Sequence, residues 1–361
     1  MRLRICIIAS SQFPIREPFA GGLEAFTHTV ARRLITRGHS VTLFAAGGSD
    51  PDLGAQMLIP ERLEFTEAAR SDVGAMPVDW MQQHHAYLGL MLHLAGSDEF
   101  DVIHNNSLHH LPLALSSMVP APVLTTLHTP PTPWLESAMN YASPSSVFMA
   151  VSSATAQAWQ ETVSAGVIAN GVDTEVWKVG PGGPGCVWTG RLVAEKAPHL
   201  AIDAARAAGR SITLAGPIMD RAYFDAQVAP RLGDDAVYAG HLHHAELVEL
   251  VGSAEVAVVS SQWDEPYGLV AAEAMSCGTP VAAFARGGLV EIVTEETGAL
   301  AADGSVASLA AAITRAATCE RRVVRERAEQ HLSLDRMVTE YENVYAQMAE
   351  EISPRQAAPV R

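Results

Sequence analysis

The chain has 361 residues, more than one ordinary hydrophobic core accommodates, so two domains are expected. Hydrophobic residues make up 48% of the chain and charged residues 18%, which is typical of a globular protein in water. The 24 basic and 40 acidic residues give a formal charge of -16. This charge disfavours nucleic-acid binding and docking on anionic lipid, because both need a basic surface.

No apolar run approaches the ~20 residues that a membrane-spanning helix needs, so we expect no integral membrane segment. The start, Met1–Ala9, resembles a signal peptide but lacks a small-residue cleavage site, and a short buried strand explains it better. The four cysteines are Cys6, Cys186, Cys277 and Cys319. They are far apart in the sequence and form no CxxC pair, which indicates free thiols and predicts a cytoplasmic protein.

Strands and helices alternate through the first half of the chain. The expected strands are Leu3–Ala9, Ser40–Ala45, Asp101–His104, Val123–Leu127 and Ser146–Val151, and the expected helices are Glu24–Arg37 and Asp79–Leu94. This alternation predicts a doubly wound parallel sheet.

The second half repeats the pattern. The expected strands are Cys186–Thr189, Ser211–Ala215, Ala236–Tyr238, Val256–Val259 and Val281–Phe284, and the expected helices are Pro198–Ala208, Ala245–Gly252, Val270–Ser276 and Ser305–Ala317. A Gly/Pro cluster at 180–185 precedes the second sheet. We place one domain at 1–168 and the other at 169–333, followed by a last helix at 334–350 and a Pro/Ala-rich tail, 353–361, that is expected to be disordered.

The segment Asp264–Ala283 is the most informative part of the sequence. Glu265 and Glu273 bracket a Pro-Tyr-Gly turn that leads into a helix of small residues. Such a turn gathers free backbone N–H groups at the positive end of a helix dipole, which suits a phosphate, and the two carboxylates suit hydroxyl donors. A nucleotide-sugar, with its diphosphate and its many hydroxyls, satisfies both.

This segment resembles the E-x7-E signature of retaining glycosyltransferases with the GT-B fold, most closely family 4. Three further motifs occur in the same order: the glycine loop Gly21-Gly22-Leu23-Glu24, the basic motif Thr189-Gly190-Arg191-Leu192 with Lys196, and the crossover 168–173. The resemblance covers nearly the whole chain. It implies two Rossmann-like α/β domains that face a central cleft, with an N-terminal acceptor domain and a C-terminal donor domain. The last helix would cross back to the N-terminal domain.

Arg191 and Lys196 follow an expected strand, and the resemblance makes them a clamp for the diphosphate leaving group. An isolated pair of this kind would be an ordinary solvated pair, but Gly190 and the downstream carboxylates favour the functional interpretation. Family members usually have glycine after this lysine, whereas this chain has Ala197-Pro198. Pro198 can begin the helix as its first residue, so we expect Lys196 to keep its place.

For Glu273, placed in the first turn of its helix, the resemblance implies a contact with the ribose hydroxyls, and helix-dipole complementation is the simpler alternative. Glu265 would face the hydroxyls of the donor sugar. The backbone of Tyr267, Gly268, Leu269 and Val270 would hold the sugar and diphosphate.

Other loops at strand ends complete the expected site. Gly21 and Gly22 would approach the donor closely, or they form a turn and nothing more. They lack the spacing of a dinucleotide fingerprint, which disfavours an NAD-dependent oxidoreductase. Leu242, in the loop 241–246, would cup the nucleobase. Asn170 contacts the donor or caps a turn.

His128 would lie beside the donor sugar, or it is a structural hydrogen-bonding residue. The remaining histidines occur largely as doublets without zinc-site spacing, so we expect no metal. Trp80, Trp134 and Tyr87 either line an acceptor cleft or belong to the N-terminal core.

The sequence thus predicts a cytoplasmic, metal-independent retaining glycosyltransferase without a cofactor. It would transfer a hexose, with UDP-glucose as the first choice of donor, to a hydroxyl acceptor. The alternatives are a GT-B nucleotide-sugar epimerase or hydrolase and a non-catalytic nucleotide-sugar-binding protein. The acceptor stays open among a pterin, another small metabolite, a lipid-linked sugar and a polysaccharide, and the oligomeric state stays open too. The acidic charge and the 6% aromatic content favour a small acceptor.

Overall fold

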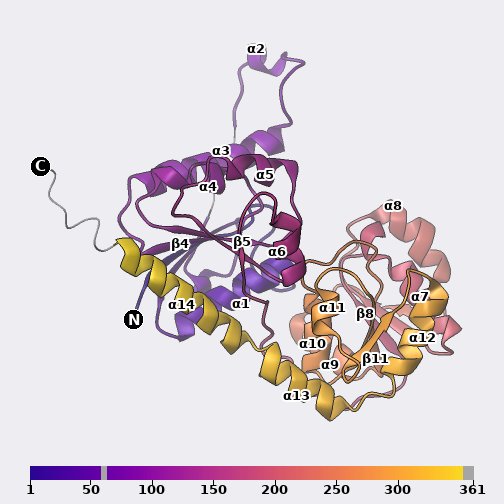
Figure 1. Ribbon diagram of the computed structural model, residues 1–361. Coiled ribbons are helices and arrows are strands. Elements are labelled where there is room, and N and C mark those ends of the chain that lie inside the picture. Colours follow the sequence, from indigo (N-terminus) through magenta and orange to yellow (C-terminus); the bar gives the residue numbers. More distant parts are fainter. Residues whose placement is uncertain (58–62, 353–361) are drawn as a thin grey trace, which may run out of the picture.

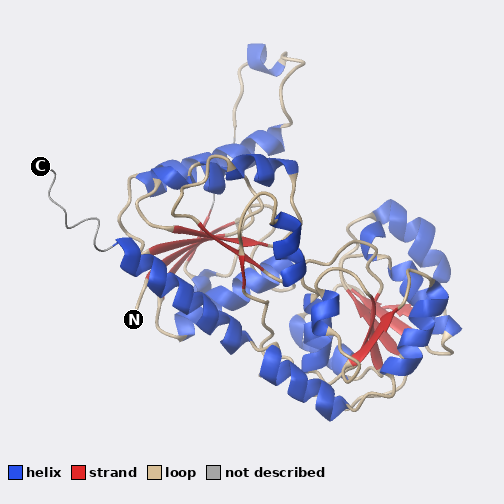
Figure 2. Ribbon diagram, viewed as in Figure 1, coloured by secondary structure: helices blue, strands red, loops and turns tan. Residues whose placement is uncertain are grey.

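Two parallel β-sheets, each with helices on both faces, lie side by side in the protein (Figures 1 and 2). The computed structural model describes residues 1–57 and 63–352. In the described residues, the first sheet has the strand order β3-β2-β1-β4-β5-β6-β7 and the second has the order β10-β9-β8-β11-β12-β13. This arrangement confirms the prediction of two doubly wound α/β units.

The first sheet consists of strands that are largely buried, as a parallel sheet covered on both faces requires. Its strands are β1 (Arg4–Ile8), β2 (Ser40–Ala45), β3 (Ala55–Met57), β4 (Val102–Asn105), β5 (Val123–Leu127), β6 (Val147–Ala150) and β7 (Gly166–Val167). The helices of this half are α1 (Gly22–Thr36), α2 (Glu67–Arg70), α3 (Val78–Ala95), α4 (Leu111–Ala114), α5 (Pro133–Met139) and α6 (Ser153–Trp159).

The second sheet comprises β8 (Cys186–Thr189), β9 (Ile212–Ala215), β10 (Ala236–Tyr238), β11 (Val256–Val259), β12 (Val281–Phe284) and β13 (Gly298–Ala301). Its helices are α7 (Pro198–Ala207), α8 (Arg221–Tyr223), α9 (His244–Gly252), α10 (Leu269–Ser276), α11 (Leu289–Ile292), α12 (Val306–Ala316) and α13 (Arg321–His331). A π-helical turn, Phe224–Val228, continues α8.

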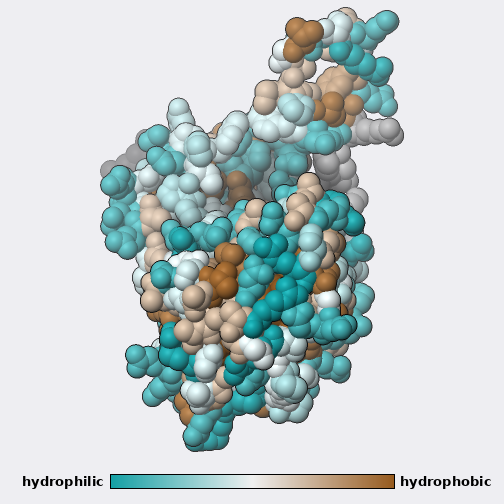
Figure 3. Space-filling model, turned by 90° about the vertical axis from the view of Figure 1, so that its right-hand side faces the viewer, coloured by the Kyte–Doolittle hydropathy of each residue, from teal (hydrophilic) through white to brown (hydrophobic). Residues whose placement is uncertain are grey.

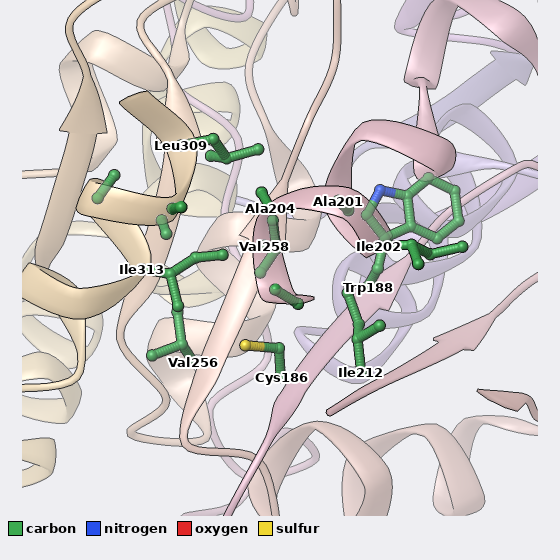
Figure 4. Packing of buried hydrophobic residues seen from close by; sticks show 14 of the residues in the cluster. Cys186, Trp188, Ala201, Ile202, Ala204, Ile212, Val256, Val258, Leu309 and Ile313 are labelled. Carbon is green, nitrogen blue, oxygen red and sulfur yellow. The ribbon is translucent and has the colours of Figure 1, made fainter. Parts of the chain in front are cut away.

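Apolar side chains fill the space between each sheet and its helices. On one face of the second sheet, Trp188 and Val256 from the strands meet Ile202 of α7 and Ile313 of α12 (Figure 4). Burying such side chains stabilises the fold by roughly 1.5–3 kcal/mol each. This core therefore fixes the strand ends from which the loops of the site emerge.

The last helix, α14 (Leu334–Ile352), runs back across the molecule and packs on the first sheet (Figure 1). Its Met337, Tyr341 and Tyr345 are buried in the core that contains α1 and β1. The expected return of the last helix is thereby confirmed. The tail that was expected to be disordered, 353–361, lies outside the described residues.

The surface on the side of the second sheet is mostly hydrophilic with scattered hydrophobic residues (Figure 3). The segment around α2 projects away from the first sheet (Figure 1) and carries the exposed Val73 and Met76.

The elements expected from the sequence are present with small shifts at their ends. Sequence reasoning missed the short or amphiphilic ones, among them β3, β13, α5, α6 and α13. The domain boundary at residues 168/169 stays a prediction; the last strand of the first sheet ends at Val167 and the first strand of the second begins at Cys186.

Candidate active site

A cavity of about 780 Å³ lies between the two sheets, where the carboxyl ends of their strands face each other. All strand pairs are parallel, and the order in which successive strands are added reverses at a switch point, between β1 and β4 in the first sheet and between β8 and β11 in the second. Ligands of open α/β sheets bind at such points. The loops after all four of these strands lie at or beside the cavity wall, so two switch points are joined into one site.

Arg191 reaches across the cavity from the loop after β8 to the glycine loop after β1. A Cβ atom on Gly21 would lie 3.9 Å from Arg191 Cδ and 3.2 Å from Glu24 Oε2. Arg191 Nη2 is 3.4 Å from Glu195 Oε1, a mostly exposed pair that contributes little to stability. Burial raises the pKa of Glu24, and the positive charge of Arg191 partly opposes this shift. The guanidinium is therefore placed at the seam between the two halves of the molecule.

Lys196 and Glu265 form an ion pair at the cavity wall. Lys196 Nζ lies 2.5 Å from Glu265 Oε1 and 4.9 Å from the centre of the Trp263 ring. The Glu265 side chain is only 9% exposed, so this pair is shielded from solvent. The lysine is thus held at a fixed point by a carboxylate and an indole face.

The residue after Lys196 explains why glycine is usual there. Ala197 adopts φ 48° and ψ 49°, a left-handed conformation that costs an alanine roughly 1–2 kcal/mol. Pro198 is the first residue of α7, as expected, so the departure from the family pattern leaves the helix start intact.

The N-terminus of α10 points its free amides into the cavity. Gly268 precedes the helix with φ 103°, and a Cβ atom there would lie 2.5 Å from Leu289 Cδ2, so this position requires glycine. Within the described residues, the N–H groups of Leu269 and Val270 have no intramolecular acceptor. Helix N-termini with unpaired amides bind anions.

Glu273 is the fifth residue of α10, so the expectation that it lies in the first turn was wrong. The helix begins at Leu269, which places Glu273 one turn further along and weakens the simple dipole explanation. Its side chain lines the cavity, and burial raises its pKa to about 7. Within the described residues its carboxylate has no hydrogen-bond or ion-pair partner, which leaves it available to a ligand.

At the cavity wall, the loop after β1 contacts the loop before α9 and the first residue of α9, His244. His241 Nε2 lies 3.1 Å from the carbonyl oxygen of Phe19, and His244 Nδ1 lies 3.7 Å from Glu17 Oε1. The rings of Phe19 and His244 are 6.4 Å apart. Leu242 lies between the two histidines in the sequence and lines the same cavity.

His128 lies at the end of β5 on the first-sheet side of the cavity. Its Nε2 is 2.9 Å from Asn106 Oδ1, and its ring packs 4.8 Å from that of Phe26. Burial lowers the pKa of His128 to about 3, so the imidazole is neutral at pH 7. A neutral imidazole can donate or accept a hydrogen bond.

Several buried polar atoms at the cavity have no hydrogen-bond partner among the described residues. They include Asn170 Oδ1, Trp263 Nε1 and Tyr267 Oη. Buried polar groups are nearly always paired, so unpaired ones at a cavity indicate that a ligand or water completes them. For Asn170 this observation favours the ligand contact over the turn cap.

Residues of the first half of the chain also hold the Pro-Tyr-Gly turn that follows Glu265. The hydroxyl oxygens of Ser152 and Thr155 donate to the carbonyl of Pro266 at 2.5 and 3.0 Å. Glu291 accepts hydrogen bonds from the amides of Ser153 and Ala154 at 3.0 and 2.8 Å. The first residues of α6 therefore connect the two domains directly at the site.

The sequence-derived site residues all lie on this one cavity: Gly21, Gly22, His128, Gly190, Arg191, Lys196, Leu242, Glu265, Tyr267, Gly268, Leu269, Val270 and Glu273. Their individual roles stay predictions. Sequence reasoning missed Trp263, Phe19 and Glu17 as cavity residues, whereas His244 belongs to the loop 241–246 that it expected at the nucleobase. Trp263 could have been noticed, because it stands two residues before Glu265.

Comparison with known families identifies the chain. Residues 181–331 match the family model described as Glycosyl transferases group 1, and residues 20–176 match that described as Glycosyltransferase Family 4. The chain belongs to the group 1 glycosyltransferases with the GT-B fold. This glycosyltransferase therefore transfers a sugar from a nucleotide-sugar.

Curated relatives support the assignment. The glycosyltransferase is 28% identical over 363 residues to the glycogen synthase of Mycobacterium tuberculosis, covering 86% of this chain and 85% of that protein. It is 38% identical over 141 residues to the 2-deoxystreptamine glucosyltransferase of Streptomyces kanamyceticus, covering 37% of this chain and 36% of that one.

Solved structures show the same fold. HepE from Anabaena, in complex with UDP and glucose, aligns with a TM-score of 0.74 at 20% identity, over 96% of this chain and 100% of that chain. Sucrose-phosphate synthase from Thermosynechococcus elongatus aligns with a TM-score of 0.75 at 20% identity, over 97% and 100% of the two chains.

Among the residues that the structure describes, none of the helices is long and apolar enough to span a bilayer. Within the same described residues, no group of three or more His, Cys, Asp or Glu side chains is placed to hold a metal ion.

Proposed function

We propose that the glycosyltransferase is a retaining enzyme that moves glucose from UDP-glucose to a hydroxyl acceptor. The observation that carries this proposal is the convergence of Arg191, Lys196 and the free amides of Leu269 and Val270 on one cavity. Two cations and a helix N-terminus within one enclosed space suit a diphosphate better than any other common metabolite group.

The leaving group is stabilised by charges that are in place before the reaction. Breaking the bond between the anomeric carbon and the phosphate oxygen puts negative charge on the diphosphate. Arg191 and Lys196 meet that charge, and the cavity walls strengthen the attraction by excluding water. Because these cations neutralise the diphosphate, the proposed reaction needs no metal ion.

Retention follows from a reaction on one face of the sugar. The acceptor oxygen bonds to the anomeric carbon as the phosphate oxygen leaves, and that phosphate oxygen takes the acceptor's proton. Glu265 is paired with Lys196 at 2.5 Å, so it is suited to accept hydrogen bonds from sugar hydroxyls rather than to attack the anomeric carbon. No covalent intermediate with the protein is then required.

The choice of donor is supported by relatives. HepE is described in complex with UDP and glucose and with UDP-glucose, and a matching segment belongs to a glucosyltransferase. Glu273 would accept the ribose hydroxyls, and the loop with Leu242 would hold the base. The four free cysteines, three of them buried, favour a reducing compartment, so we propose that the enzyme acts in the cytoplasm.

The proposal is tested by incubating the purified enzyme with UDP-glucose and a panel of hydroxyl acceptors, and by recording the anomeric configuration of the product by NMR. We expect an α-glucoside and UDP. A β-glucoside would contradict retention. Fast loss of UDP-glucose without any acceptor would favour a hydrolase or epimerase, and binding without turnover on any acceptor would favour a non-catalytic protein.

A further inference from the structure

Aromatic and imidazole rings of the first domain gather in a partly exposed cluster that the proposed mechanism does not use. We call it the ring cluster, and it consists of Trp80, His84, Tyr87, His109, His110 and Trp134. The rings of Trp80 and His84 stack at 5.1 Å and 14°, and those of Tyr87 and His109 stack at 4.3 Å and 19°. Trp134 lies 4.3 Å from His110 and 5.8 Å from Trp80.

Three elements bring these rings together. Trp80, His84 and Tyr87 occupy one face of α3, His109 and His110 lie in the loop between β4 and α4, and Trp134 is the second residue of α5. Trp134 is 51% exposed, so a large apolar ring faces solvent there although it lies beside other rings. Contiguous exposed apolar surface, in contrast to single scattered residues, marks interaction or ligand-binding sites.

Residues that neighbour the ring cluster in the sequence line the cavity. Leu108 lines the cavity and directly precedes His109, and Thr129 lines the cavity five residues before Trp134. Tyr87 Oη donates to the carbonyl of Ala9 and accepts from the amide of Ser11, while Ser10 between them lines the cavity. A molecule bound on the ring cluster can therefore extend past Leu108 towards the reacting centre.

The segment that supplies the ring cluster carries no basic side chain other than histidine. Residues 71–177 contain no lysine and no arginine. Burial lowers the pKa values of His84, His109 and His110, that of His109 to about 3, so these imidazoles are neutral at pH 7. This segment offers a phosphorylated or carboxylated ligand no lysine or arginine, so a neutral ligand suits the site better.

The chemistry of the rings selects among neutral ligands. Ring faces pack against an apolar face of a ligand, and imidazole nitrogens hydrogen-bond with its polar edge. Within the described residues, the buried Nδ1 atom of His84 has no partner. A sugar ring presents C–H groups on its face and hydroxyls around its edge, and it therefore satisfies both parts of this surface.

We propose that the ring cluster is the acceptor-binding platform and that the acceptor carries an uncharged sugar ring, which stacks on Trp134 and Trp80. This inference rests on the proposed function. It names the class of acceptor that the first domain selects, and it excludes acceptors recognised through a phosphate.

The test measures binding of maltose to the enzyme saturated with UDP, by saturation-transfer NMR and titration, in the wild type and in Trp134→Ala and Trp80→Ala. Trp134 is half exposed, so its removal leaves the fold intact. We expect each variant to bind maltose at least about tenfold more weakly, the scale of a lost aromatic anchor. Trp134→Phe should recover part of the affinity, because it keeps a ring. Glucose 6-phosphate should bind no better than glucose.

Tyr141→Ala is the matched control, since Tyr141 is a 70% exposed ring beyond the end of α5 and outside the ring cluster. Its maltose affinity should equal that of the wild type. UDP affinity, measured by calorimetry, should be unchanged in all variants. Absence of UDP binding in the wild type would contradict the proposed function. Three results, each with normal UDP binding, would overturn the platform alone. They are no binding of maltose, a maltose affinity that neither tryptophan substitution changes, and a strong preference for glucose 6-phosphate.

Discussion

At the scale of single residues, the site contains a lysine that is already paired. Lys196 is held between Glu265 and Trp263. When a diphosphate enters the cavity, its oxygens would replace Glu265 as part of the negative charge that pairs with Lys196. Fixing a cation before the charge develops is the usual source of electrostatic catalysis, because no reorganisation is needed during the reaction.

Lys196→Ala should reduce turnover about a hundredfold, because one preorganised charge at the leaving group is lost. The chain has one other lysine, Lys178, which is exposed, so Lys178→Ala is the matched control and should retain wild-type turnover. Steady-state kinetics with UDP-glucose measures both. Equal turnover in the two variants would remove Lys196 from the mechanism.

The raised pKa of Glu273 predicts that the stability of the protein depends on pH. Its pKa is about 7 in the folded protein and near 4.5 in the unfolded chain, so the folded state holds an extra proton between these values. The stability due to this group is present below about pH 4.5 and is lost as pH rises through about 7. Glu273→Gln should therefore be more stable than the wild type at pH 8, and the gain should vanish near pH 5. Urea unfolding at both pH values measures this, and an equal gain at both would contradict the shifted pKa.

At the scale of secondary-structure elements, the start of α10 depends on one backbone conformation. Gly268→Ala would force a side chain into φ 103° and against Leu289 Cδ2. It should lower the free energy of unfolding by at least ~1 kcal/mol and weaken UDP binding, because the amides of Leu269 and Val270 would shift.

Gly89, within α3, is the control for this glycine. A Cβ atom there meets nothing within 4 Å, so Gly89→Ala should stabilise the protein by roughly 0.5–1 kcal/mol. Urea unfolding and UDP calorimetry on both variants separate the two effects. Unchanged UDP affinity in Gly268→Ala would show that the helix start does not hold the diphosphate.

The elements also show what the sequence can predict. The strand Ser40–Ala45 was located to the residue because an apolar run follows a helix-ending glycine. α13 was missed because it is rich in arginine and glutamate and buries only Val324 and Ala328, which leaves no continuous apolar stripe. The order of the motifs along the chain was enough to predict that the site residues lie on one cavity. The contacts of Phe19, Glu17 and His244 were not predictable, since they arise from the approach of two domains.

At the scale of the whole molecule, α14 fastens the second domain to the first through a buried polar network. Tyr345 Oη lies 2.7 Å from His104 Nδ1, His104 Nε2 lies 2.8 Å from Thr126 Oγ1, and Thr126 Oγ1 lies 3.1 Å from Tyr341 Oη. Burial lowers the pKa of His104 to about 3, so the imidazole is neutral and its two nitrogens play different hydrogen-bonding roles. The network fixes how the last helix lies on the first sheet.

Tyr345→Phe should cost about 1–3 kcal/mol of unfolding free energy, because it leaves a buried nitrogen of His104 without its partner. Tyr141→Phe removes a hydroxyl from an exposed ring and should change stability by less than ~0.5 kcal/mol. Urea denaturation of both variants provides the comparison. Equal stabilities would mean that the network does not contribute to docking of the helix.

A crystal structure of the enzyme with UDP tests whether the two cations and the start of α10 hold the diphosphate. We expect the diphosphate oxygens within hydrogen-bond distance of Arg191, Lys196 and the amides of Leu269 and Val270, and the ribose hydroxyls on Glu273. A UDP molecule bound elsewhere, or bound in this cavity with its phosphates away from both cations, would contradict the account.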